Sequence, residues 1–309
     1  MSSAINEDLV SVVIPCYNVA EYIEDCIRSV FQQKVNLQVI CVDNNSTDQT
    51  VLILQKLKSE FPELVITEEK EKGANHARNK GLALALGKYI QFLDADDRLL
   101  EGKIIHQVGL LSENSILVAP YIRKGPSGEL PIFPEKNIWK GLFITRLGIT
   151  SSALFNTNDV KSIGGWNTKL SSSQEYDLMF RLMKAGKNVV IDDQIMTVVL
   201  DRPSGQISTS DPKGRWLNYL NLRRQIFNEL QINHVVEFDT NRDFYYQSFF
   251  DTIHIAYPHC PEEARGVYEE FIKGKYTVQK SPATGKLFHA LMRVGGFEFA
   301  EKIKSLLKK

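Results

Sequence analysis

Short apolar runs alternate with amphipathic helical patterns through the first hundred residues of the chain. The runs are rich in β-branched residues, whereas apolar residues between them recur every three or four positions. The predicted strands are residues 9–14, 38–42, 65–67 and 89–93, and the predicted helices are 23–31, 51–61 and 74–86. Gly87 is expected to end the third helix. This alternation predicts βαβ units, and hence an α/β fold with a mixed, mostly parallel sheet flanked by helices.

Polar side chains follow three of these strands at the point where each strand ends. The segments are Pro15-Cys16-Tyr17-Asn18, Asp43-Asn44-Asn45 and Asp94-Ala95-Asp96-Asp97. In open α/β sheets, ligands bind outside the carboxyl ends of the strands. We therefore expect the three segments to form one binding rim.

Three carboxylates stand within four residues at Asp94, Asp96 and Asp97. They repel one another, and a divalent cation that prefers oxygen ligands, Mg²⁺ or Mn²⁺, would relieve the repulsion. Such a cation often takes part of its coordination from phosphate oxygens. The alternative is an acidic turn that caps a helix beginning near Leu99.

Two other positions near the rim carry a functional and a structural interpretation. Asp43 either binds a base or ribose, or forms an Asx-turn with the residues that follow it. Between Gly73 and Gly81, Arg78 or His76 either faces a diphosphate or lies on an exposed helix face.

Carboxylates also stand in the first turn of a helix predicted over residues 176–184. Glu175 is the candidate general base for an acceptor hydroxyl, and helix capping is the alternative. Glu175 and Asp177 point to different faces of the helix, so only one of them can serve, with Asp177 as the second choice.

Composition restricts the class of protein. Lys and Arg together number 37, as do Asp and Glu, so the chain lacks the basic surplus of a dedicated nucleic-acid binder. The four cysteines form no zinc-ligand spacing. The polar start and the absence of a long apolar run predict a cytoplasmic protein.

Beyond residue 210 the composition changes to helical patterns. The predicted helices are 216–230, 244–256, 262–272 and 287–307. The expected domains are therefore residues 1–210 and a C-terminal helical extension at 211–309. Residues 286–309 combine apolar faces with a net charge of +4 (six Lys and Arg less two Glu). They lie either on an anionic membrane surface, as a peripheral attachment, or against the catalytic domain or a second subunit in a homodimer.

Four blocks resemble the family 2 glycosyltransferases with a GT-A fold. They are residues 11–18, 42–48, 73–81 and 92–97, and a weaker fifth block joins Gly164-Gly165-Trp166 to Gln174-Glu175. The resemblance covers about residues 8–205. It implies an inverting, non-processive glycosyltransferase of hexosyltransferase type. Within residues 1–210 it implies a nucleotide-binding half at 8–98 and an acceptor half at 99–210.

The resemblance implies a role for each matching position. Pro15, Tyr17 and Asn18 would line the nucleotide with Asp43 and Asn45; Arg78 would lie near the diphosphate, Asp94 on the ribose side and Asp96 on the metal. Glu175 falls where the family usually places an aspartate as the base, so the base here is one methylene longer. Gly165 and Trp166 would form an acceptor-side wall, with Trp166 stacking on a sugar; the alternative for Trp166 is a core aromatic at a turn.

The predicted reaction moves a sugar from a nucleotide-sugar, UDP being the usual nucleotide for these motifs, to an acceptor hydroxyl. The acceptor would be a surface polysaccharide, another glycan or a lipid-linked oligosaccharide. The main alternative is a catalytically silent module that binds a nucleotide-sugar or glycan on the same fold. A sugar-1-phosphate nucleotidyltransferase is disfavoured because Pro15-Cys16-Tyr17-Asn18 replaces the basic, glycine-rich loop expected after the first strand.

Overall fold

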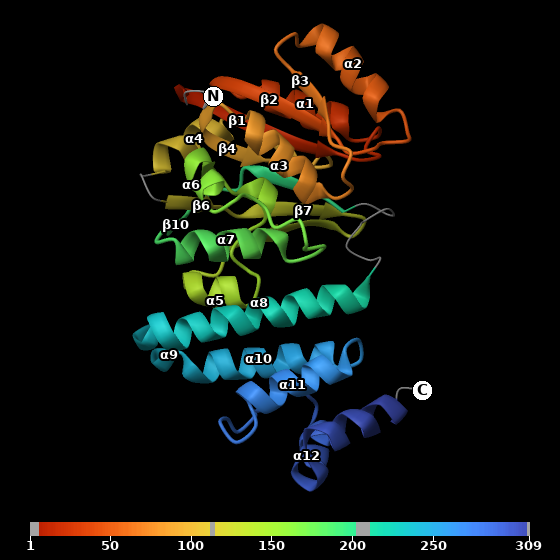
Figure 1. Ribbon diagram of the computed structural model, residues 1–309, viewed down its shortest axis with the longest axis vertical. Coiled ribbons are helices and arrows are strands. Elements are labelled where there is room, and N and C mark those ends of the chain that lie inside the picture. The colour runs from red at the N-terminus through yellow and green to blue at the C-terminus, as the bar shows by residue number, and fades with distance from the viewer. Residues whose placement is uncertain (1–5, 112–114, 202–210, 308–309) are drawn as a thin grey trace. The chain divides into compact units, whose positions relative to one another are not determined.

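The computed structural model describes residues 6–111, 115–201 and 211–307 (Figure 1). These residues form two compact units. The first holds residues 6–170 and 174–201, and the second holds 171–173 and 211–307. The predicted domain boundary near residue 210 lies outside the described residues.

The first unit is built on a five-stranded sheet in the order β3-β2-β1-β4-β9. Its strands are β1 Asn6–Cys16, β2 Asn36–Asp43, β3 Val65–Glu68, β4 Gly87–Phe92 and β9 Phe155–Asn156. The first four run parallel and β9 is antiparallel to β4. The mixed, mostly parallel sheet predicted from the sequence is confirmed.

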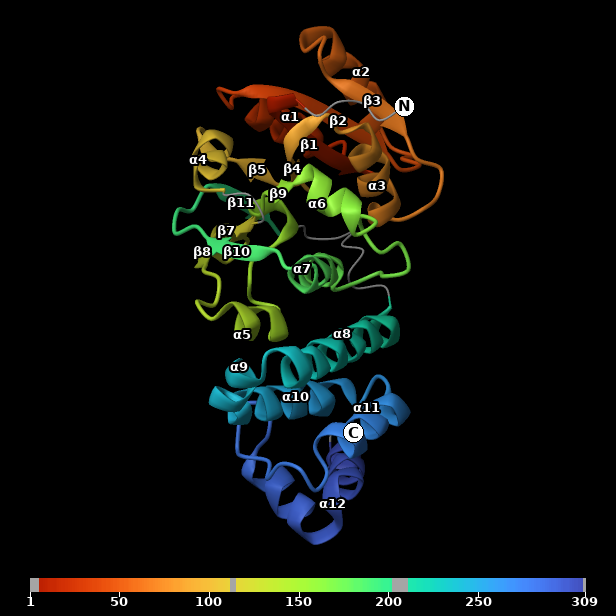
Figure 2. The same ribbon diagram turned by 60° about the vertical axis from the view of Figure 1, so that its left-hand side comes forward.

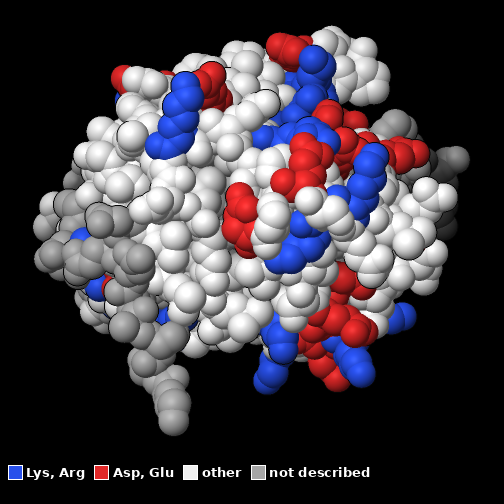
Figure 3. All heavy atoms as spheres, turned by 90° about the horizontal axis from the view of Figure 1, so that it is seen from above, with Lys and Arg blue, Asp and Glu red and all other residues white. Residues whose placement is uncertain are grey.

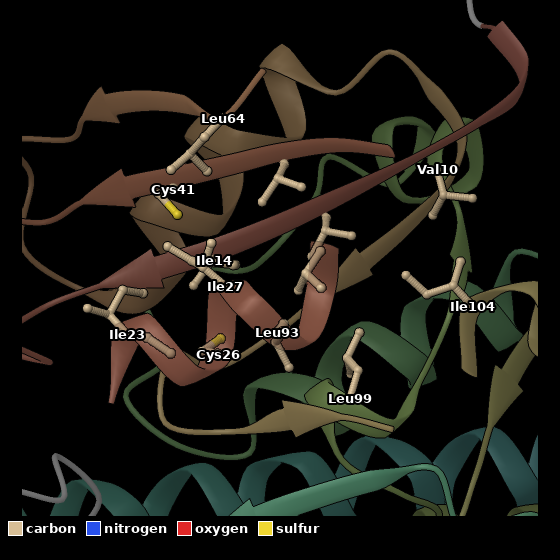
Figure 4. Packing of buried hydrophobic residues seen from close by; sticks show 14 of the residues in the cluster. Val10, Ile14, Ile23, Cys26, Ile27, Cys41, Leu64, Leu93, Leu99 and Ile104 are labelled. Atoms are coloured by element: carbon tan, nitrogen blue, oxygen red, sulfur yellow. The ribbon is translucent and has the colours of Figure 1, made fainter. Parts of the chain in front are cut away.

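Helices cover the sheet because β1 is apolar on both faces. The helices are α1 Ile23–Phe31, α2 Thr50–Glu60 and α3 Ala74–Leu84. Val10 and Ile14 point into a core shared with Cys26 and Ile27 of α1 (Figure 4). Val13, on the opposite face of the strand, meets α3 at Gly81. Burial on both faces explains the continuous apolar run of this strand.

Gly87 does not end the third helix, as the sequence suggested. The helix ends at Leu84, and Gly87 is the first residue of β4. A Cβ at this position would lie 2.5 Å from the carbonyl oxygen of Leu9 and 2.6 Å from the amide nitrogen of Ser11. The glycine is therefore needed for the close approach of β4 to β1.

The middle of the chain adds two small sheets and short helices to the first unit. One sheet pairs β10 Asn188–Ile191 with β6 Ser115–Val118; the other has the order β5 Arg98–Leu99, β11 Thr197–Leu200, β7 Tyr121–Gly125 and β8 Gly128–Ile132. The helical segments are α4 Lys103–Leu110, α5 Ile138–Phe143, the 3₁₀ turn η1 Thr150–Ser152, α6 Thr157–Ser162 and α7 Gln174–Lys184. The acidic segment therefore leads into a strand, and no helix begins at Leu99. The capping alternative for that segment is wrong.

The second unit is helical and packs around Phe227. Its helices are α8 Pro212–Asn233, α9 Val235–Thr240, α10 Arg242–Ala256, α11 Pro261–Phe271 and α12 Lys286–Leu307. The ring of Phe227 lies 5.0 Å from Phe238, 5.1 Å from Tyr246 and 5.4 Å from Phe271. α8 and α10 lie side by side in both views (Figures 1 and 2). The four predicted helical segments are confirmed, although the last is broken at Gly296, and α9 was missed because it is only six residues long.

Two surface properties bear on the class of protein. Within the described ranges, every helix is too short or too polar to cross a membrane. On the face shown in Figure 3, basic and acidic side chains are interspersed, so that face carries no patch of one sign.

Candidate functional site

The predicted rim exists because β1, β2 and β4 are adjacent and parallel. Cys16, the last residue of β1, pairs in register with Asp43, the last residue of β2. The backbone amide of Leu93, which follows β4, donates to the carbonyl of Val13. The three polar segments therefore leave the sheet at one edge. Tyr17 is exposed there, and Pro15 is half-buried.

Asp43 forms the Asx-turn, one of the two roles that the sequence left open, and keeps one oxygen for the other. Its Oδ2 accepts a hydrogen bond from the amide of Ser46, as in an Asx-turn. Its Oδ1 is buried and has no hydrogen-bond partner within the described part of the chain. A buried acceptor without a donor is costly, so this oxygen is suited to a donor that a ligand supplies.

The two asparagines predicted beside Asp43 hold the loops of the rim together. The Asn18 Oδ1 accepts from the amide of Thr47 at 2.8 Å. The amide of Asn18 in turn donates to Ser46 Oγ at 3.1 Å. Asn45 has a positive φ of 67° and donates through Nδ2 to the carbonyls of Glu69 and Lys70. In this structure both side chains fix the backbone around Asp43.

Arg78 of α3 is buried, at 6% exposure, and lies behind the acidic segment. Its Nη2 donates to Asp94 Oδ1 at 2.7 Å, and its Nη1 donates to Gln174 Oε1 at 2.9 Å. Its guanidinium also lies over the ring of Trp166, 4.6 Å from the centroid. The alternative that placed Arg78 on an exposed helix face is wrong, because the guanidinium points inward to the rim.

The three carboxylates of the acidic segment have different surroundings. Asp94 is held by Arg78, whereas Asp97 is buried and accepts hydrogen bonds from Ser151 Oγ and the amide of Leu200. Burial, reinforced by the charges of Asp94 and Asp96, raises the pKa of Asp97 well above its usual range. Asp96 is half-buried.

The carboxylate oxygens of the acidic segment suit a hard cation that a diphosphate would also coordinate. Among the described residues, no three His, Cys, Asp or Glu side chains are placed to hold a metal together. Mg²⁺ commonly takes only one or two carboxylates and completes its shell with water and phosphate oxygens. Asp96, half-buried in the acidic segment, could supply such a carboxylate.

A buried lysine behind the acidic segment was not predicted. Lys103 of α4 is fully buried, and its Nζ donates to the Oε1 atoms of Gln91 and Gln107 at 2.5 and 2.7 Å. Gln91 in turn donates through Nε2 to the carbonyl of Ser151, and the hydroxyl of Ser151 donates to Asp97. Burial lowers the pKa of Lys103 to about 7. One sequence signal existed, since Gln91 interrupts an otherwise apolar strand.

α7 brings Glu175 toward the same part of the rim. Its first residue, Gln174, is the hydrogen-bond partner of Arg78. Glu175 is half-buried, and burial raises the pKa of its carboxyl group; the charge of Arg78 opposes this effect and that of Asp94 adds to it. The charge of Glu175 therefore interacts with those of Arg78 and Asp94. A general base for a ligand bound at the rim would show such an interaction.

Asp177 has a different environment. It is buried and forms an ion pair with Arg181, whose Nη1 donates to the carbonyl of Ile163. The pair ties α7 to the loop that contains Gly164 and Gly165. This placement favours Glu175 over Asp177 as the reactive carboxylate.

Trp166 does not form the predicted sugar-stacking wall. Its side chain is 2% exposed and packs edge-on against Phe92, with ring centroids 5.0 Å apart. The Asn79 amide group bonds both the amide and the carbonyl of Trp166 at 2.8 Å. With Arg78 over its ring, Trp166 is the core aromatic of the alternative interpretation. Gly165 is buried beside it at a φ of +70°.

Comparison with protein families and curated proteins identifies relatives of the first unit. The model of the family described as Glycosyl transferase family 2 matches residues 11–165. The putative teichuronic acid biosynthesis glycosyltransferase TuaG of Bacillus subtilis (strain 168) is 41% identical over 109 residues, which cover 35% of this chain and 43% of TuaG. The minor teichoic acid biosynthesis protein GgaB of the same strain is 32% identical over 128 residues, covering 38% of this chain and 14% of GgaB. The chain therefore matches less than half the length of either relative.

Solved structures are similar over most of the chain. S. aureus TarS 1-349 in complex with UDP-GlcNAc has a TM-score of 0.58 at 17% identity, covering 86% of this chain and 92% of that chain. The mannosyltransferase PcManGT from Pyrobaculum calidifontis, in complex with GDP-Man and Mn²⁺, also gives 0.58, at 16% identity and with 98% and 88% covered. At these identities the likeness shows a common fold, and it confirms the predicted GT-A class.

Proposed function

The chain belongs to glycosyl transferase family 2, and from the geometry of its rim we propose that it transfers a hexosyl group from a nucleotide-sugar to an acceptor hydroxyl. The observation that carries the proposal is the position of Arg78. One buried guanidinium bonds both Asp94 of the acidic segment and Gln174, the residue before Glu175. Arg78 therefore links Asp94, which is assigned to the nucleotide-sugar, to the start of the helix that carries Glu175, the proposed base.

In the proposed complex, each residue of the rim contacts a different part of the donor. Asp43 Oδ1 accepts a hydrogen bond from the edge of the base, while Tyr17 and Pro15 line it. Asp94 lies on the ribose side, and Asp96 would hold the divalent cation, Mn²⁺ or Mg²⁺. When bound, that cation neutralises charge on the diphosphate leaving group.

Glu175 acts on the acceptor. Its carboxylate accepts the proton of the acceptor hydroxyl while that oxygen attacks the anomeric carbon. The bond from the anomeric carbon to the diphosphate oxygen breaks on the opposite face, so the product is inverted. The raised pKa of Glu175 makes it a stronger base than an ordinary carboxylate, which helps it to accept a proton from a hydroxyl.

The names of the relatives support a proposal for the acceptor class. TuaG and GgaB are named for teichuronic acid and teichoic acid biosynthesis, and the acceptor proposed here is likewise a growing surface polymer or its lipid-linked precursor. UDP is the proposed nucleotide of the donor. The cytoplasmic location and the homodimer stay predictions.

Nucleotide binding followed by turnover tests the function. UDP with Mn²⁺ should raise the melting temperature by mass action. Asp96→Ala should abolish the metal-dependent part of the shift, and Asp193→Ala, which removes an exposed aspartate outside the rim, should preserve it. Release of UDP from UDP-hexoses in the presence of acceptor glycans should then require Glu175.

Two outcomes would contradict the proposal. If no nucleoside diphosphate stabilises the protein with either metal, there is no donor site at the rim. If nucleotides bind but no sugar is transferred across a panel of donors and acceptors, the protein is instead a nucleotide-sugar-binding module.

A further inference from the structure

α12 docks on the second unit through one face. Phe288 packs 4.3 Å from the ring of His254, and Phe297 packs 4.3 Å from the ring of Tyr268. Glu301, four residues after Phe297, is also buried and bonds Nδ1 of His254 at 2.5 Å. Gly296 breaks the helix, with a φ of 78°, and the two arms on either side of it are visible in Figure 1.

Other side chains of both arms are apolar and exposed. In the first arm Leu287 is 59% exposed and Val294, seven residues later, is 83% exposed. In the second arm the exposed apolar residues are Phe299, Leu306 and Leu307. α12 thus supplies five of the 17 large apolar side chains that are exposed among the described residues. We call these five residues the α12 apolar face.

α12 therefore has two sets of apolar side chains, one that is buried in the second unit and one that is exposed. An amphipathic helix of a globular protein needs one apolar stripe to reach its core. α12 already satisfies that need through Phe288 and Phe297. The α12 apolar face is therefore not required for folding of the second unit, and an exposed apolar surface of this kind marks an interaction site.

The charges beside the α12 apolar face are mainly positive. Lys286 and Arg293, like Leu287 and Val294, are seven residues apart, and both are exposed in the first arm; Lys302 is exposed in the second. Of the two acidic residues of α12, Glu301 is buried against His254, and Glu298 lies 3.4 Å from Arg265 and 4.0 Å from Lys302. Two further lysines, Lys308 and Lys309, lie outside the described residues. A chain with zero net charge therefore has a local cationic surplus at this face.

We propose that the α12 apolar face binds an anionic lipid bilayer, with its apolar side chains at the headgroup boundary and Lys286, Arg293 and Lys302 against lipid phosphates. A helix whose apolar side chains are flanked by cations binds such a surface in two ways: it buries apolar area, and its cations are attracted to the anionic lipids. A second copy of the chain fits less well. A two-fold contact would bring two copies of one cation-rich surface together, and like charges across an interface oppose association.

Co-sedimentation of the full chain with vesicles tests the proposal. We expect binding to vesicles that contain phosphatidylglycerol, weaker binding to pure phosphatidylcholine, and release as salt is raised. The double variant Leu287→Ser/Val294→Ser should lower the partition coefficient roughly tenfold, and each of Lys286→Gln and Arg293→Gln should lower it about fivefold. Val236→Ser is the matched control, because Val236 is 82% exposed but lies on α9.

The same samples distinguish the competing occupants. Equal sedimentation of wild type and the double variant, or no sedimentation with anionic vesicles, would overturn the proposal. So would a dimer in analytical ultracentrifugation that the double variant dissociates. The test does not use catalysis, so it stands even if the donor site fails its own test.

Discussion

The guanidinium of Arg78 joins the acidic segment to the start of α7, and Glu175 follows directly. If Glu175 is the base, its role is to accept a proton and not to bind the donor. Glu175→Gln keeps the size of the side chain but cannot accept a proton, so kcat should fall by roughly 10²–10⁴-fold. The Kd of UDP, measured by calorimetry with Mn²⁺, should stay near the wild-type value.

Glu175→Asp is the matched control for this variant. It restores a carboxylate, and it should retain more activity than the glutamine variant. A fully active Glu175→Gln enzyme would remove Glu175 from the mechanism.

The pKa of Glu175 leads to a pH dependence. Burial raises it, so the carboxyl group stays protonated, and inactive as a base, at pH values where an ordinary glutamate is already ionised. The acidic limb of the kcat profile should therefore lie above the usual glutamate pKa of about 4.3. Rates measured between mildly acidic and neutral pH should rise with pH, and the residual rate of Glu175→Gln should lack that limb.

Lys103 leads to a pH dependence of stability instead. Its pKa is about 7 in the folded protein and 10.5 is the ordinary value, so between these pH values the unfolded chain binds the extra proton. Stability should consequently rise with pH in this window, by up to about 1.4 kcal/mol per pH unit from this group.

Urea unfolding at pH 7, 8 and 9 measures the slope that Lys103 contributes. Lys103→Met should lose it, whereas Lys302→Met, which removes an exposed lysine, should keep it. Identical slopes in Lys103→Met and wild type would show that Lys103 does not titrate in this range.

At the scale of elements, the packing of α3 on β1 depends on Gly81. A Cβ there would lie 2.2 Å from Cγ1 of Val13, inside a covered face of the sheet. Gly81→Ala should therefore destabilise the protein by roughly 1–3 kcal/mol despite the better helix propensity of alanine. Gly109→Ala in α4 is the control, because its Cβ meets nothing within 4 Å. Chemical denaturation should show lower stability only for Gly81→Ala; equal effects would mean that α3 can shift away from the strand.

The elements that the sequence predicted correctly are those with local signals. β1, β2 and β4 carry β-branched apolar runs. Because the carboxyl ends of parallel strands meet at one edge of a sheet, the polar residues that follow these runs could be placed together. The helix patterns of α1 and α8 extend over several turns and are equally local.

The errors concern contacts between residues far apart in the chain. Gly87 resembled a helix stop, but its role depends on the backbone of Leu9 and Ser11 in another strand. Trp166 resembled a sugar platform because nothing nearby in sequence shows that Phe92 and Arg78 bury it. The burial of Lys103 was missed, since Gln91, its partner, is twelve residues away. Burial is a property of the folded chain, so a motif alone does not reveal it.

At the scale of the whole molecule, each unit has a core of its own. The core of the second unit centres on Phe227, and Phe227→Ala should cost about 3–5 kcal/mol in that unit. Scanning calorimetry should show a lowered transition, while the Kd of UDP, whose proposed site is made by the first unit, should be unchanged at low temperature. A weakened Kd would mean that the donor site depends on the integrity of the helical unit.

If the nucleobase binds at Asp43 as proposed, the Asp43 oxygen that has no partner among the described residues bears on which nucleobases the rim can accept. A carboxylate oxygen only accepts hydrogen bonds, so it matches a base that presents an N–H on its pairing edge. Uracil and guanine carry such an imino proton, whereas cytosine and adenine present a lone pair at the corresponding nitrogen. Those two bases offer a pairing-edge donor only at the exocyclic amino group, so they would have to bind in a different position to bond Asp43. If Asp43 binds the base as proposed, the side chain that closes an Asx-turn would therefore also favour uridine and guanosine diphosphate sugars.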